Sequence, residues 1–295
     1  MILKIFLIIW MFNYGNSLVH KQYYDVNGSG YKKVYAGGIA LNSFSHKAAD
    51  FLVKNKIRGN FFNNLGSGAY LISRVSPDIK IFIDGRTEIF GAKFFQIYQK
   101  IYDQGNQPLF ENTVKHLNIS GVFLTSVKKD LPAGFLRYLY SSPDWKLVYL
   151  DHDAVIFLKN TAENEPPIAR YAIDLNAWKP DPAGLARLET NQAEVVPYFK
   201  RALTLARFGF YEQAGAELTA ALNIYPLYPQ AYKLLGDIQL KKGPPAKAIY
   251  YYQVSALNQP RNIKKQLDVA KLYDQLGDEG RALKWAYKIV GDFPK

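Results

Sequence analysis

The sequence contains no cysteine, which excludes disulfide frameworks, thiol nucleophiles and metal sites built on thiolates. Histidine is scarce too, and the four that occur lie too far apart to form the short spacings typical of zinc motifs. They are His20, His46, His116 and His152. We therefore expect no metal and no cofactor in this protein.

Acidic residues are fewer than basic ones, 25 against 37, which leaves a formal net charge of +12. The excess is spread along the chain. Residues 1–160 carry 19 basic and 11 acidic side chains, and residues 161–295 carry 18 and 14, so the two parts have net charges of +8 and +4. Proteins that bind nucleic acid concentrate positive charge on one face or along one helix. We therefore expect no nucleic-acid partner.

A hydrophobic run of full membrane-spanning length is also missing. The stretch Ile5–Val19 is uncharged, but its 15 residues fall short of the roughly 20 that a bilayer requires. Lys4 followed by a short apolar region resembles a secretory signal peptide. The alternatives are a signal anchor, the last transmembrane helix of a longer polytopic protein, and a buried strand or helix.

The first three of these interpretations give residues 1–20 the role of a signal peptide or membrane anchor. They place the rest of the chain outside the cytoplasm, either exported or anchored to the inner membrane with its bulk in the periplasm. We therefore expect contact with a membrane only through residues 1–20.

The length of 295 residues, at about 150 per domain, and a hydrophobic content of 48% favour two folded domains. Helical and strand-like patterns alternate between Tyr35 and Asn160, which predicts an α/β domain over 33–160 with a mixed sheet of about five strands. The expected helices are Ser45–Lys54, Ala69–Val75, Lys93–Tyr102, Phe110–Leu117 and Ala133–Tyr140. The expected strands are Gly59–Phe62, Ile79–Ile83, Gly121–Thr125, Lys146–Leu150 and Ala154–Leu158, the last two forming a hairpin. Residues 161–194 are predicted to be a linker or connector.

A period of 34 residues runs through the carboxyl-terminal part. Glycine, alanine and proline each recur with it, at Gly209, Gly243 and Gly277, at Ala214, Ala248 and Ala282, and at Pro226, Pro260 and Pro294. The glycine permits a turn between two helices, the alanine lets those helices approach, and the proline ends the second helix. This is the register of tetratricopeptide repeats, with units 195–228, 229–262 and 263–295 in an all-α solenoid.

In such repeats the first helix of each pair lines a concave groove, which indicates a protein or peptide partner. Its expected groove residues are Phe199, Lys233, Asp237, Leu240, Lys264 and Lys271. The alternative is an ordinary solvated face on repeats that only cap or space the domain before them.

Polar side chains follow two of the predicted strands. Asn63 and Asn64 follow the first strand, and Asp84, Arg86 and Glu88 follow the second. Ligands of open α/β sheets bind beyond the carboxyl ends of the strands, so these groups are candidates for binding a sugar hydroxyl, a phosphate or a peptide amide. They meet only if the two strands are parallel neighbours. The alternatives are turns and helix caps, with Arg86 paired to an adjacent carboxylate.

Several segments of the α/β region together resemble one bacterial family of polytopic membrane proteins. They are Ala48-Ala-Asp-Phe-Leu52, Gly59-Asn-Phe-Phe-Asn-Asn64, Gly68-Ala-Tyr-Leu-Ile72, Pro77, Lys80-Ile-Phe-Ile-Asp-Gly-Arg86, Phe90-Gly91, Trp145-Lys-Leu-Val-Tyr149 and Ala154-Val-Ile-Phe157. In that family a membrane region similar to the GT-C glycosyltransferases, which use lipid-linked sugars, precedes an extracytoplasmic α/β domain that often continues into tetratricopeptide repeats. The soluble domain of oligosaccharyltransferase catalytic subunits is more distantly similar.

The resemblance spans about residues 36–158 and adds Tyr70 to the candidate ligand-binding residues. It implies a non-catalytic extracytoplasmic region of a GT-C-like glycosyltransferase system that recognises an acceptor, a glycan or lipid-linked one among them, or a protein partner. The catalytic carboxylates of GT-C enzymes lie between transmembrane helices, so no catalytic residue is assigned here. The alternative is a free-standing exported or membrane-tethered repeat scaffold with a structural α/β domain. An autonomous hydrolase or transferase needs paired carboxylates, for which Asp84 and Glu88 are the compact candidates.

Overall fold

A computed structural model describes residues 35–36, 39–40, 44–126, 131–180, 191–243, 245–259 and 262–291. The predicted signal peptide or anchor, residues 1–20, lies outside these described residues. The chain divides into two compact units. The α/β unit contains the described residues up to Ile173 together with 191–193, and the repeat unit contains the rest. No helix among the described residues combines the length and apolar character needed to cross a bilayer.

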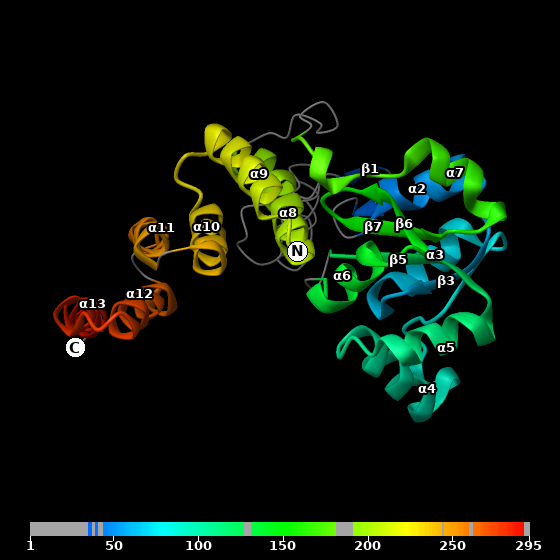
Figure 1. The fold of residues 1–295 in the computed structure, drawn as a ribbon, viewed down its shortest axis with the longest axis horizontal. Coiled ribbons are helices and arrows are strands. Elements are labelled where there is room, and N and C mark those ends of the chain that lie inside the picture. Colours follow the sequence, from blue (N-terminus) through cyan, green and yellow to red (C-terminus); the bar gives the residue numbers. More distant parts are fainter. Residues whose placement is uncertain are drawn as a thin grey trace, which may run out of the picture. The chain divides into compact units, whose positions relative to one another are not determined.

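A five-stranded mixed sheet forms the centre of the α/β unit (Figure 1), as the sequence predicts. Its strands in spatial order are β4 (Ile79–Ile81), β3 (Gly59–Asn63), β5 (Ile119–Thr125), β7 (Ala154–Lys159) and β6 (Trp145–Leu150). Strand β3 is parallel to both β4 and β5, whereas β7 is antiparallel to β5 and to β6. The predicted hairpin of the last two strands is therefore confirmed. A separate pair of short strands, β1 (Tyr35–Ala36) and β2 (Ile39–Ala40), was not predicted.

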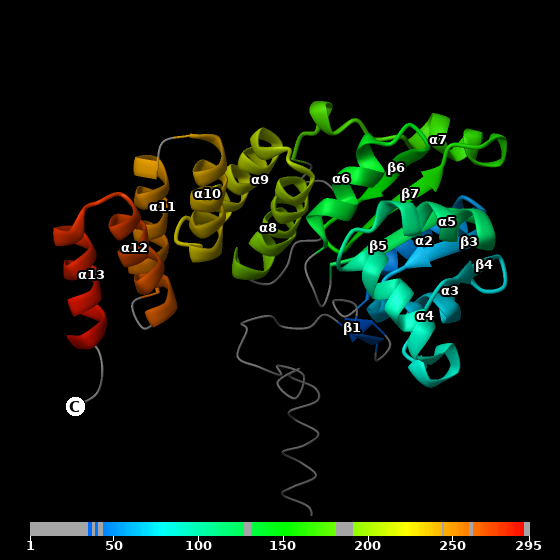
Figure 2. The same ribbon diagram turned by 60° about the horizontal axis from the view of Figure 1, so that its bottom comes forward.

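Helices cover both faces of this sheet, because successive residues of its strands point to opposite sides. Phe61 packs on the face with α2 (His46–Lys54), α3 (Gly68–Val75) and α7 (Glu165–Tyr171). Phe62 packs on the other face with aromatic rings of α4 (Thr87–Tyr102), α5 (Gln107–Leu117) and α6 (Ala133–Ser141). The result is a three-layer α/β/α arrangement, which Figure 2 shows from a second side.

Strand β3 is the switch point of the sheet, because the strands that follow it in the chain lie on both of its sides. After β3 the chain passes through α3 to β4 on one side, and then through α4 and α5 to β5 on the other side of β3. In open α/β sheets the crevice beyond the carboxyl ends of strands at such a switch point is where ligands bind. The topology therefore directs attention to the ends of β3 and β5.

The predicted connector, residues 161–194, is more structured than its sequence indicates. Helix α7 lies within it and packs on the α/β unit, where Tyr171 contacts Phe51. The segment that follows, Asp174–Trp178, belongs to the repeat unit. The two prolines at the start of α7 favour a linker in the sequence, although proline is well tolerated in a first helical turn.

The repeat unit consists of helical hairpins. Its helices are α8 (Asn191–Phe208), α9 (Tyr211–Ile224), α10 (Pro229–Lys242), α11 (Pro245–Leu257), α12 (Ile263–Gln275) and α13 (Glu279–Gly291). The second helices begin at 211, 245 and 279, so 245 − 211 and 279 − 245 both give 34 residues, the period found in the sequence. Helices α10 and α12 begin at 229 and 263, which is the same spacing.

The recurring residues occupy the positions that their size requires. Gly209 and Gly277 have φ angles of +99° and +74°, a conformation that favours glycine, and each lies between the two helices of a hairpin. Gly243 adopts an extended backbone instead. Ala214 and Ala248 are fully buried, which confirms their role at close helix contacts, whereas Pro260 and Pro294 lie outside the described residues.

A buried ion pair fixes the first hairpin of the repeat unit. Arg201 of α8 donates from Nε and Nη2 to the two carboxylate oxygens of Glu217 of α9, both at 2.8 Å. The indole of Trp178 donates to the same carboxylate at 2.8 Å. All three donors are needed because a buried carboxylate is costly unless its oxygens are bonded. The Asp174–Trp178 segment is thereby fixed on α9.

Replacing Ala248 with Glu should destabilise the repeat unit by about 3–5 kcal/mol, because an unpaired charge would be buried between α10 and α11. The measurement is urea unfolding of the full chain followed by circular dichroism at the helical band. Ala246→Glu is the matched control, since Ala246 is exposed on the same helix. An Ala248→Glu midpoint equal to that of the control would contradict the assigned packing.

Candidate functional site

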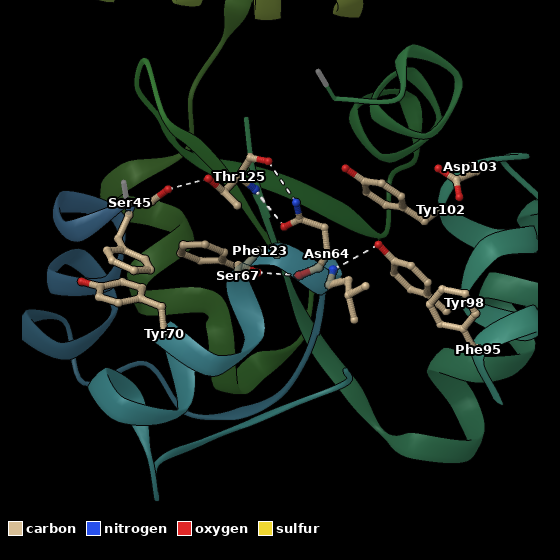
Figure 3. Close-up of a pocket in the computed structure, with 13 residues that line it drawn as sticks. Ser45, Asn64, Ser67, Tyr70, Phe95, Tyr98, Tyr102, Asp103, Phe123 and Thr125 are labelled. Carbon is tan, nitrogen blue, oxygen red and sulfur yellow. Dashed lines mark hydrogen bonds between the residues drawn. The ribbon is translucent and has the colours of Figure 1, made fainter. Parts of the chain in front are cut away.

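A cavity of about 280 Å³ lies at the carboxyl ends of β3 and β5 in the α/β unit (Figure 3). Its floor consists of buried residues, and its rim consists of residues that are partly or fully exposed. The floor residues are Ser45, Asn64, Ser67, Tyr98, Tyr102, Phe123 and Thr125, and the rim residues are Phe44, Leu65, Gly66, Tyr70, Phe95 and Asp103. The cavity therefore occupies the switch point of the sheet.

Asn64 connects the end of β3 to the end of β5 across the cavity floor. Its side-chain Nδ2 donates to the carbonyl oxygen of Thr125 at 3.0 Å, and its Oδ1 accepts from the Thr125 amide at 3.1 Å. The side chain thus imitates a peptide group of a neighbouring strand. The Thr125 hydroxyl in turn lies 2.7 Å from the hydroxyl of Ser45, which brings the start of α2 to the same floor.

Asn63 makes the equivalent connection on the other side of β3. Its Oδ1 accepts from the backbone amides of Phe82 and Ile83 at 2.9 and 3.2 Å, and its Nδ2 donates to the Ile83 carbonyl at 2.8 Å. These bonds explain why β4 ends at Ile81, two residues before its predicted end. Asn63 is fully buried and does not line the cavity.

Gly68, at the start of α3, lies directly against the residues that follow β4. A Cβ atom at this position would come within 2.2 Å of the Ile83 carbonyl oxygen and 2.6 Å of the Asp84 Cα. Only glycine fits this approach. It sets the position of the helix that carries Tyr70 to the rim of the cavity.

Two tyrosines of α4 direct their hydroxyls toward Asn64 and Thr125 (Figure 3). Their rings are stacked with centroids 5.4 Å apart. The Tyr98 hydroxyl accepts from the Leu65 amide at 3.1 Å, and burial raises its pKa to about 12. The Tyr102 hydroxyl, in a side chain that is only 3% exposed, has no hydrogen-bond partner among the described residues, and burial raises its pKa as well. Both groups are therefore neutral at physiological pH.

A second pair of rings forms the opposite part of the rim. Phe44 and Tyr70 stack with centroids 4.8 Å apart. The Tyr70 hydroxyl lies 2.8 Å from Nδ1 of His46, and burial is the main cause that raises its pKa. Tyr70 and Asn64 are thus the two sequence-predicted site residues that line the cavity.

Asp84 and Arg86 form an ion pair with each other. Arg86 donates from Nε and Nη2 to the Asp84 carboxylate at 3.0 and 2.6 Å, and its backbone amide donates to the same carboxylate at 2.8 Å. These bonds lower the pKa of Asp84, chiefly through the Arg86 side chain. Asp84 is buried, Glu88 is exposed in the first turn of α4, and none of the three lines the cavity. Parallel pairing of β3 with β4 thus brings Asn63 to Phe82 and Ile83, without making a shared open site.

The predicted groove residues all lie on the first helices α8, α10 and α12. Lys233 donates to both carboxylate oxygens of Asp237 at 3.1 and 2.9 Å, and Tyr252 also donates to Asp237. Phe199 packs edge-on against Tyr228. The remaining three, Leu240, Lys264 and Lys271, are exposed. We call these three the first-helix surface.

Sequence reasoning did not identify most of the residues that line the cavity. Ser45, Ser67, Phe95, Tyr98, Tyr102, Asp103 and Thr125 were all missed. Tyr98 and Tyr102 are four residues apart on one helix face, a spacing that also describes ordinary core residues. The usable signal was Thr125, which ends the predicted strand Gly121–Thr125, since ligands of open α/β sheets bind beyond the carboxyl ends of strands.

Among the described residues, no group of three or more histidine, aspartate and glutamate side chains is arranged to hold a metal ion. No protein-family model and no curated protein matches the sequence.

Two solved structures show a partial likeness. The crystal structure of MamA is 22% identical over 35% of this chain and 57% of the MamA chain, with a TM-score of 0.30. A structure of the CopN-Scc3 complex is 16% identical over 41% of this chain and 78% of its own, with a TM-score of 0.31. Likenesses this weak support no inference, so the interpretation depends on the geometry above.

Replacing Arg86 with Lys should lower stability at neutral pH without changing the cavity, because Asp84 would lose its two-pronged partner. The native pKa of Asp84 is lowered, so its contribution is present above the unfolded pKa of about 3.9 and is lost as pH falls through the native pKa. Urea midpoints should therefore differ between the original chain and the variant at pH 7 and converge as pH falls below the native pKa of Asp84. Equal midpoints at pH 7 would contradict a structural ion pair.

Proposed function

We propose that this chain is a non-catalytic binding and scaffold protein. The α/β unit holds a ligand group in its cavity, and the repeat unit holds a protein partner on the first-helix surface. The strongest support for a non-catalytic role is that the polar side chains at the strand ends already serve the fold. Asn63, Asn64, Asp84 and Arg86 are bonded to the backbone or to each other, which is a structural use of these side chains.

The cavity at the strand ends is suited to binding a ligand. Six of the thirteen lining residues are aromatic, and the stacked pairs Tyr98–Tyr102 and Phe44–Tyr70 belong to different elements. Ligand pockets are typically lined by apolar and aromatic side chains with a few placed polar groups, and this cavity has that composition. The hydroxyls of Ser45, Ser67, Tyr98 and Thr125 are held in place by hydrogen bonds.

The repeat unit offers a surface of mixed character for a protein. Leu240 is 42% exposed, and Lys264 and Lys271 are exposed on the next first helix. An exposed apolar side chain and two exposed cations on first helices suit a partner segment that carries apolar and acidic residues. Stacked helical repeats generally bind proteins along an extended face of this kind.

The partner that we propose is a GT-C-like membrane glycosyltransferase, and the compartment is extracytoplasmic, with residues 1–20 as the signal peptide or anchor. The family resemblance of residues 36–158 supports the partner, and the uncharged stretch Ile5–Val19 supports the compartment. The alternative, a free-standing exported or membrane-tethered scaffold, shares the compartment and differs in the partner.

A photo-crosslinking amino acid placed at Leu240 or Lys271 should form a covalent product with one polytopic membrane protein in the native cell, identified by mass spectrometry. The matched control positions are Tyr250 and Leu257, which are 60% and 57% exposed on the second helix α11. A product at the first helices that contains a soluble protein would favour the free-standing scaffold. The same products at all four positions, or at none, would reject the first-helix surface as a binding face.

A reporter that is active only outside the cytoplasm, fused after Lys295, should be active, because residues 1–20 direct export. The control is the same fusion without residues 1–20, which should be inactive. Activity of a cytoplasm-only reporter at the same site would contradict the proposed compartment.

A further inference from the structure

Three lysines of helix α12 form no ion pair with any carboxylate of the described residues. They are Lys264, Lys265 and Lys271, and the acidic residues of the same helix, Asp268 and Asp274, do not pair with them. We propose that the face of α12 that carries these lysines binds a short extended segment of the protein partner, in which two acidic residues flank an apolar one. This inference rests on the proposed function of the repeat unit and specifies the chemistry of its partner.

The order of side chains along α12 determines this pattern. Lys264 and Lys271 are exposed, and Leu267, which is 40% exposed, lies between them on the same side of the helix because the spacing is i, i+3, i+7. A cation, an apolar side chain and a second cation therefore follow one another along one stripe. A segment with an acid, an apolar residue and a second acid complements this stripe.

Asp268 makes the middle of the stripe unfavourable for an acid. It lies between Lys264 and Lys271 on α12, and its negative charge acts on Lys265 and on Tyr252 of the preceding helix. A further carboxylate placed beside Leu267 would meet this like charge, which costs free energy. The stripe thus selects for an apolar residue at the centre as well as for acids at the two ends.

The spacing of the two exposed lysines fits an extended segment. Seven residues of helix rise by about 10 Å, and four residues of an extended chain rise by about 13 Å. Side chains two residues apart in an extended chain point to the same side, so the first, third and fifth residues of the segment would face α12. The long, flexible side chains of Lys264 and Lys271 cover the remaining difference.

Lys265 adds a cation at the edge of the stripe, where α12 packs against α11 (Figure 2). Its Nζ donates to the Ser255 hydroxyl of α11 at 3.1 Å, and that hydroxyl donates in turn to the Pro229 carbonyl at 2.7 Å. Burial and then the positive charge of Lys233 lower the pKa of Lys265 to about 8, and Asp268 opposes them. A carboxylate of the partner would supply the counter-charge for this half-buried ammonium and would raise its pKa.

The neighbouring groups of α10 and α11 are already bonded to one another. Lys233 donates to both carboxylate oxygens of Asp237, and Tyr252 donates to the same carboxylate. Tyr252 is neutral around pH 8, because burial raises its pKa. Lys265 thus loses its charge near pH 8 beside an ion pair and a neutral phenol.

The test is fluorescence anisotropy of the full chain with three labelled peptides. The first is Ser-Glu-Ser-Leu-Ser-Glu-Ser, the second has Gln in place of both Glu residues, and the third has Glu in place of Leu. We expect the first peptide to bind about tenfold more tightly than either of the others. A chain that attracts acids only through its net charge of +12 would bind the third peptide most tightly, and that order would overturn the proposal.

Lys264→Gln and Lys271→Gln should each weaken binding of the first peptide several-fold, because each variant removes one of the cations that pair with an acid. The matched control is Lys247→Gln, which removes an exposed lysine from the second helix α11 and should leave binding unchanged. Circular dichroism checks that all variants keep their helical content. Equal weakening by all three variants would overturn the assigned face.

The charge of Lys265 provides a second readout. Binding of the first peptide should weaken several-fold from pH 7 to pH 9, as Lys265 loses its proton. The Lys265→Gln variant should bind more weakly at pH 7 and should show little change between the two pH values. An affinity of the original chain that does not depend on pH would overturn the proposal.

Crosslinking at Leu240 or Lys271 tests the proposed function separately. A crosslinked protein partner together with the wrong order of peptide affinities would overturn only the pattern of acidic and apolar residues. Absence of binding by all three peptides would overturn the pattern as well, and the crosslinking result then decides the proposed function on its own.

Discussion

Two adjacent asparagine side chains connect strand β3 to both of its neighbours, β4 and β5, and the geometry of the cavity depends on them. Asn63 bonds to Phe82 and Ile83 beyond β4, and Asn64 bonds to Thr125 at the end of β5. Each amide supplies a donor and an acceptor, as a peptide group does. The sheet is thereby continued past the last regular strand residue, at the position where parallel strands would otherwise separate around the switch point.

Burial makes this arrangement strongly constraining. A buried amide that loses its partners costs about 1–3 kcal/mol for each unsatisfied group, so the two asparagines and the backbone groups that they serve hold one another in a single geometry. The consequence is a preorganised floor for the cavity. Tyr98 is connected to this floor by a hydrogen bond from the Leu65 amide, and Ser45 is connected to it by a hydrogen bond with the Thr125 hydroxyl. A preorganised floor lowers the entropic cost of ligand binding, which suits a recognition site.

Much of the fold could be predicted because it depends on local pattern. Short apolar stretches between helical patterns predicted the strands, and a 34-residue period predicted the helical hairpins, since glycine and alanine are selected there by local sterics. The cavity was less accessible to prediction. Asn63 and Asn64 have the composition of a ligand site, and only the pairing of strands far apart in sequence shows that they bond to the backbone. Tyr102 has the spacing of a core residue in the sequence, and its place in the cavity lining becomes visible only in the folded structure. Asp84 and Arg86 were left open as either a site or an ion pair, and their mutual bonds show the ion pair.

Native-state hydrogen exchange tests the role of the two asparagines most directly. If their side chains hold the strand ends together, the backbone amides of Phe82, Ile83 and Thr125 should exchange only through global unfolding of the α/β unit. Their opening free energies should then equal those of central amides such as Val122, and all should fall together in urea. Exchange of these three amides at the rate of the exposed Gly85 would show that the strand ends open independently and would contradict a preorganised floor.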